Sequence, residues 1–146
     1  MPILVVFYHL SVAFWVGGSV LFTFVLTPII FRAYDRDVAG GIVGHLFPAY
    51  FRWGLGCGGI GLLTLLAARG EHFALSVVIL LIMLTLTALG AFYIEPRAAA
   101  LKREIPSFVT TPKGHPQRRA FSRLHAISAV ANLAVVTGGV VLVVLF

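Results

Sequence analysis

Charged side chains are scarce in this sequence of 146 residues, where they make up 11% against roughly 25% in an ordinary soluble domain. A single cysteine, Cys57, excludes a disulfide framework. Apolar residues reach 60% of the chain, and a small soluble domain cannot bury that much apolar surface. The sequence also has no HExxH, no CxxC and no glycine-rich phosphate loop. These features exclude a soluble enzyme and a disordered tail, and they indicate an integral membrane protein.

Four apolar stretches are long enough to cross a membrane, which needs about 20 residues each. They cover about 3–31, 49–68, 73–95 and 120–146. Since the backbone in lipid must satisfy its own hydrogen bonds and no alternating strands occur, these are expected to be helices. We predict an all-α fold, a four-helix antiparallel bundle that forms one transmembrane domain over 1–146. The connections are 32–48 and 96–119, and the piece 38–47 either lies on the membrane surface or extends the second helix up to Pro48.

Basic residues predict the orientation of the bundle. All lysines and arginines except Arg69 lie in or beside the connections 32–48 and 96–119. The positive-inside rule therefore places these connections in the cytoplasm and both termini outside. We expect a multi-pass protein of the plasma (inner) membrane, with the lipid bilayer as its partner and no cleaved signal peptide. The net charge of +6 needs no nucleic-acid partner, because topology explains where it sits.

Ionisable residues inside membrane helices are costly, and each asks for an explanation. His9 lies in the first helix, about 9 Å below its outer end. It is either a metal or haem ligand or a neutral histidine hydrogen-bonded to a neighbouring helix, for example to Ser76. His125 is the second candidate metal ligand, but the two histidines are expected to lie about 15 Å apart along the membrane normal. A haem b ligated by one of them remains open, while a haem shared by both is disfavoured.

The last helix carries a polar stripe that predicts a ligand site. His125, Ser128 and Asn132 are spaced to share one helical face, and they either form hydrogen bonds between helices or bind a ligand near the cytoplasmic side. Glu95, with Arg97 beside it, enters the interface at a similar depth. Glu95, His125 and His45 together would make a chemically sensible, though widely spread, metal set. The expected ligand-binding residues are Glu95, Arg97, His125, Ser128 and Asn132.

Glycines and aromatic residues indicate packing. Gly54 and Gly58 form a pair of small residues one helical turn apart, which allows close helix contact within one chain or between copies in a homo-oligomer or a larger complex. Aromatic residues near the helix ends, such as Tyr50, Trp53 and Tyr93, are typical of interfacial belts.

Four stretches together resemble the transmembrane protein 205-like family of small four-helix membrane proteins. They are His9 with Trp15-Val16-Gly17-Gly18, then Leu46-Phe47-Pro48-Ala49-Tyr50-Phe51, then Glu95-Pro96-Arg97, then Leu124-His125 with Ser128 and Asn132. The resemblance covers most of the chain and implies roles for Pro48, Glu95, Pro96, Arg97, His125 and Asn132. Known members are associated with resistance to platinum drugs.

The opening stretch is also similar to copper-resistance D-type membrane proteins and to small bacterial membrane protoporphyrinogen oxidases. These similarities imply copper handling and haem chemistry respectively. Only two methionines occur, whereas copper(I) prefers soft sulfur ligands.

Three functions follow as hypotheses. The first is binding or transport of a small ligand or metal species at the cytoplasm-side polar site. The second is a redox protein with one haem, and the third is an accessory subunit of a larger membrane complex. Whether the protein is an enzyme stays open.

Overall fold

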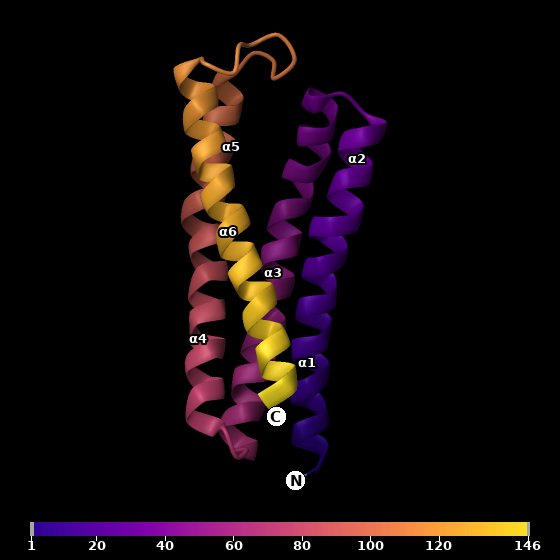
Figure 1. Ribbon diagram of the computed structural model, residues 1–146, viewed down its shortest axis with the longest axis vertical. Helices are drawn as coiled ribbons and strands as arrows, with labels where there is room; N and C mark the ends of the chain where they lie inside the picture. The colour runs from indigo at the N-terminus through magenta and orange to yellow at the C-terminus, as the bar shows by residue number, and fades with distance from the viewer. Residues whose placement is uncertain (1, 146) are drawn as a thin grey trace.

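Four long helical rods form the molecule, as the computed structural model shows for residues 2–145 (Figure 1). The first rod runs through α1 (Pro2–Val20), the π-helix η1 (Leu21–Leu26) and α2 (Thr27–Ala33). The second is α3 (Arg36–Ala68), and the third joins α4 (Phe73–Leu89), the π-helix η2 (Gly90–Ile94) and α5 (Glu95–Glu104). The fourth is α6 (Pro116–Leu145). Each rod is long and apolar enough to cross a membrane, and residues 2–145 contain no strand, so the predicted all-α membrane bundle is confirmed.

The rods are arranged so that α3 and α6 each pack against both α1 and α4. Both chain termini lie at the same end of the bundle, and the α2–α3 and α5–α6 connections lie at the other (Figure 1). The core contains Tyr8, Trp15, Leu80, Met83 and Leu142, all 2% exposed or less. Many large apolar side chains point outward instead, as a bilayer-facing surface requires.

The helix α3 starts earlier than the predicted second span. It begins at Arg36, and the Asp35 side chain caps it by accepting a hydrogen bond of 2.9 Å from the Val38 backbone N–H. The helix continues through Pro48, which stood at the predicted boundary. Of the two alternatives for residues 38–47, the structure therefore shows the extension of the second helix, because a long helix tolerates one proline where neighbouring elements pack on it.

The second basic connection is also shorter than predicted. The third rod continues as α5 to Glu104, so only residues 105–115 join it to α6. The helix α5 is polar and basic, but it is still helical, because a helix is free to extend into water beyond the lipid.

Two π-helices widen the first and third rods just before a proline. In η1 the backbone N–H and the side-chain hydroxyl of Thr27 both bond the Phe22 carbonyl, and Pro28 follows. In η2 the Glu95 backbone N–H bonds the Gly90 carbonyl, and Pro96 follows. Because proline cannot donate a backbone hydrogen bond, a widened turn at these points limits the disruption to each helix.

Gly54 and Gly58 serve contacts inside one chain. Both are buried in α3. A Cβ atom would lie 2.8 Å from Trp15 Nε1 if added to Gly54, and 2.5 Å from Trp15 Cζ3 if added to Gly58. These glycines therefore let Trp15 of α1 approach α3 closely. An interface between copies through the same glycines stays a prediction.

Candidate functional site

The polar stripe of α6 is divided by the structure. Ser128 and Asn132 line a cavity inside the bundle, whereas His125 does not. The His125 ring is exposed and stacks on Phe121, with centroids 6.3 Å apart and planes 6° from parallel. Of the three residues in the predicted stripe, only Ser128 and Asn132 thus face the bundle interior.

Asn132 is held by a hydrogen-bond network that joins three rods. Its Nδ2 donates to Thr23 Oγ1 of η1 at 2.8 Å, and its Oδ1 accepts a short hydrogen bond from the Tyr50 hydroxyl of α3. The Tyr50 hydroxyl also interacts with Ser19, which is 1% exposed. Tyr50 stacks on Phe22 with ring centroids 4.6 Å apart. These partners lower the cost of keeping an amide inside an apolar bundle.

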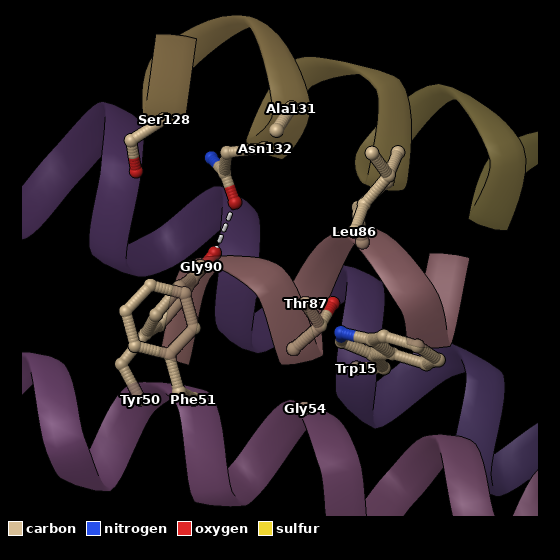
Figure 2. A pocket seen from close by; sticks show the side chains of 11 residues that line it. Trp15, Tyr50, Phe51, Gly54, Leu86, Thr87, Gly90, Ser128, Ala131 and Asn132 are labelled. Atoms are coloured by element: carbon tan, nitrogen blue, oxygen red, sulfur yellow. Dashed lines mark hydrogen bonds between the residues drawn. The ribbon is translucent and has the colours of Figure 1, made fainter. Parts of the chain in front are cut away.

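The cavity beside this network is small, and different kinds of side chain line its two sides. Ser128, Asn132 and Tyr50 gather at one side, and Leu86 and Trp15 at the other (Figure 2). Phe51, Gly54, Thr87, Gly90, Ala131 and Val135 complete the lining, which has no charged side chain. The space that the centre of a water-sized sphere can reach is about 20 Å³, enough for about one water molecule. The cavity suits a small neutral group with a polar and an apolar side.

The Ser128 hydroxyl lines this cavity and takes no part in the Asn132 network. Within residues 2–145 it makes no hydrogen bond. A hydroxyl of this kind, half-buried beside the space, can donate to or accept from a ligand.

Neither histidine predicted as a haem ligand lies at a space that fits haem. His9 Nδ1 bonds its own helix at the Val5 carbonyl, 2.8 Å away, and its ring packs edge-on against Tyr8. His9 lies in the part of α1 near the chain termini, and His125 lies toward the opposite end of the bundle. The internal cavity has neither histidine in its lining and is far too small for a porphyrin. The residues present therefore do not fit a haem.

Glu95 is half-buried and interacts with Lys102 of the same helix, while Arg97 lies over the Tyr93 ring with its guanidinium 4.0 Å from the centroid. His45 is exposed and bonds the Gly41 carbonyl through Nδ1 at 2.7 Å. Over residues 2–145 no group of three or more His, Cys, Asp or Glu side chains is placed to hold a metal ion. The set of Glu95, His125 and His45 is thus not assembled.

Two contacts that the sequence did not predict tie the ends of the rods together. Lys102 donates a short hydrogen bond to the Gly40 carbonyl of α3, and the absence of a side chain at Gly40 leaves room for its ammonium. Asp37 accepts 2.5 Å and 2.6 Å bonds from the Ser107 hydroxyl and the Phe108 backbone N–H. The Asp37 contacts fix residues 105–115 against the start of α3. The only signal in the sequence was a carboxylate and a lysine at the same predicted membrane face.

Comparison with known proteins gives the family and no activity. The family model described as "Domain of unknown function (DUF4149)" matches residues 10–107. A protein of Aquifex aeolicus (strain VF5), described as an uncharacterized protein, is 30% identical over 136 residues, covering 92% of this chain and 91% of that protein. No solved structure matches. The chain therefore belongs to the DUF4149 family, as a multi-pass membrane protein with four helical spans.

Proposed function

We propose that this membrane protein binds a small amphipathic molecule, with one hydroxyl or amide head on an apolar body, in the cavity between α1, α3, α4 and α6. The observation that carries the proposal is the position of Ser128, which presents an unused hydroxyl to the cavity beside Asn132. If the polar residues served packing alone, no donor would need to face this space. The head of the ligand would contact Ser128 and Asn132, and its apolar body would lie toward Trp15 and Leu86.

The two π-helices support a ligand-binding role for the cavity. Thr23 of η1 holds Asn132, and Gly90 of η2 lines the space directly. π-Helical turns are frequent at functional sites, and here both border the same polar cluster. Each is followed by proline, so the adjoining helix ends are less constrained than a continuous helix. A ligand larger than one water molecule would be admitted by small movements at these turns.

The test uses ethanol as the probe and Trp15 as the reporter. Trp53→Phe leaves Trp15, a lining residue, as the single tryptophan. We expect a saturable change in Trp15 emission when ethanol is added to this protein in mild detergent. Ser128→Ala should abolish the saturable change, because it removes the free hydroxyl and breaks no internal hydrogen bond.

The matched control is Ser122→Ala on the same helix, where the serine is exposed and outside the cavity. It should leave the saturable change intact. An identical response in both alanine variants would refute ligand binding at Ser128, and the polar residues would then act in packing alone.

The narrower family of the protein, its membrane and its orientation are also proposals. We propose that the chain is a member of the transmembrane protein 205-like family, supported by Pro48, Glu95-Pro96-Arg97, His125 and Asn132 in sequence order. The distribution of lysine and arginine supports the plasma membrane, with the α2–α3 and α5–α6 connections in the cytoplasm. Export of the bound molecule, and assembly into a larger complex, are further roles compatible with a bundle of this size.

A further inference from the structure

The first two turns of α6 hold three arginines, of which one is buried and two are exposed. Arg118 is 7% exposed, donates a 2.5 Å bond to the Thr111 carbonyl and lies over the Phe108 ring. It fixes the α5–α6 connection. Arg119 and Arg123 are exposed instead, and within residues 2–145 neither side chain makes a hydrogen bond or an ion pair. Two cations with no counter-charge among these residues are therefore left at this surface.

These two arginines line a hollow on the surface of α6. They are one turn apart on the same helix face, with Pro116 and Ala120 completing the lining. The hollow has about 250 Å³, several times the volume of a water molecule. Two guanidinium groups at one hollow are suited to hold a phosphate group, because each presents a planar fork of donors.

The same helix face continues into the bilayer. Ile127 and Val130, which are 50% and 69% exposed, follow Arg123 at helical spacing and present an apolar surface. The apolar run from Leu124 to Leu145 spans about 33 Å, close to the roughly 30 Å of a hydrocarbon core. Arg123 therefore lies at the edge of the hydrocarbon, and Arg119 lies one turn further out, at the depth of lipid headgroups.

We propose that Arg119 and Arg123 form a binding site for the phosphate of an anionic phospholipid. The guanidinium groups hold the headgroup, and the acyl chains run along the apolar surface of Ile127 and Val130. This continuity between a basic hollow and a lipid-facing apolar stripe is what favours a lipid over a free phosphate. The site lies outside the internal cavity and does not depend on the function proposed for that cavity.

The test is native mass spectrometry of the full chain titrated with palmitoyl-oleoyl phosphatidylglycerol, and with the corresponding phosphatidylcholine for comparison. Arg119→Gln with Arg123→Gln should lower the association constant for phosphatidylglycerol by up to about 25-fold, because each exposed ion pair with the lipid phosphate contributes up to about fivefold. Arg32→Gln with Arg36→Gln removes two exposed charges at the same end of the bundle but outside the hollow, so it should change this constant less than about twofold. Inorganic phosphate at 10 mM should not displace the lipid.

Three outcomes of this experiment would contradict the proposal. Equal losses in the two double variants would show that the whole basic end attracts lipid without a defined site. Displacement by inorganic phosphate would assign the hollow to a free anion. Equal binding of both lipids by the unaltered protein would remove the role of headgroup charge. The thermal midpoints of both double variants verify that the compared proteins are folded.

Discussion

Gly58→Ala tests the packing of the bundle at a close contact, where α3 meets Trp15 of α1 and Leu84 of α4. An added Cβ would clash with Leu84 Cδ2 and would lie 2.5 Å from Trp15 Cζ3 and 2.8 Å from Trp15 Cη2. Trp15 is 2% exposed, so its ring is held on most sides by neighbouring side chains. Overpacking of this kind costs about 1–3 kcal/mol. The gain from a better helix former is at most about 1 kcal/mol, and it is smaller in detergent because unfolded membrane proteins keep much of their helix. The net expectation is a loss of about 1–2 kcal/mol.

Gly56 provides the matched control, because it lies on the same helix and a Cβ there would meet nothing within 4 Å. Gly56→Ala should leave the free energy of unfolding unchanged or raise it by at most about 1 kcal/mol. Unfolding in sodium dodecyl sulfate, followed by tryptophan emission, compares the two variants directly. Equal stability of the two variants would refute the contact between α3 and Trp15. If Gly58→Ala instead weakened self-association without loss of stability, the glycine pair would belong to an interface between copies.

Three further predictions concern the internal network, the clamp on residues 105–115 and the topology. Tyr50→Phe removes the donor to the α6 amide and should cost about 1 kcal/mol in the same unfolding assay, whereas an unchanged midpoint would show that the bond contributes nothing. Asp37→Asn should speed trypsin cleavage at Lys113 by loosening residues 105–115, while Asp35→Asn should not, because asparagine caps a helix as well as aspartate does. Lys113→Cys should react with a membrane-impermeant maleimide only in inside-out vesicles, and labelling of right-side-out vesicles would reverse the predicted orientation.

Hydropathy predicted the four spans well because the cost of exposing polar backbone to lipid leaves little freedom inside the bilayer. It could not predict how far helices continue into water, where apolarity no longer decides. The stretch 38–47 was therefore left open between a segment on the membrane surface and an extension of the second helix, because Gly40, Gly41 and Gly44 weaken a helix. Asp35, a good N-cap residue, favours the extension that the structure shows.

The sequence predicted only part of the internal site. Asn132 stood out because an amide is rare in an apolar helix, and the structure places it at the centre of the polar network. Its partner Tyr50 was interpreted as an interfacial aromatic, since tyrosine fits both an interface and a bundle interior. Thr23 gave no signal, because threonine in a membrane helix commonly bonds its own backbone. Which side chains meet across helices depends on rotation of each rod, and that is not encoded in one helix alone.

The widened turns also bear on how the chain tolerates changes in length. A π-helical turn holds one residue more than an α-helical turn, so deleting one residue within Leu21–Leu26 restores a regular helix at that point. The same deletion in the middle of α3 would rotate every later side chain by about 100° and move Gly54 or Tyr50 off its contact. Relatives that differ by one residue in length should therefore carry the gap at η1 or η2, and engineered insertions should be placed there first.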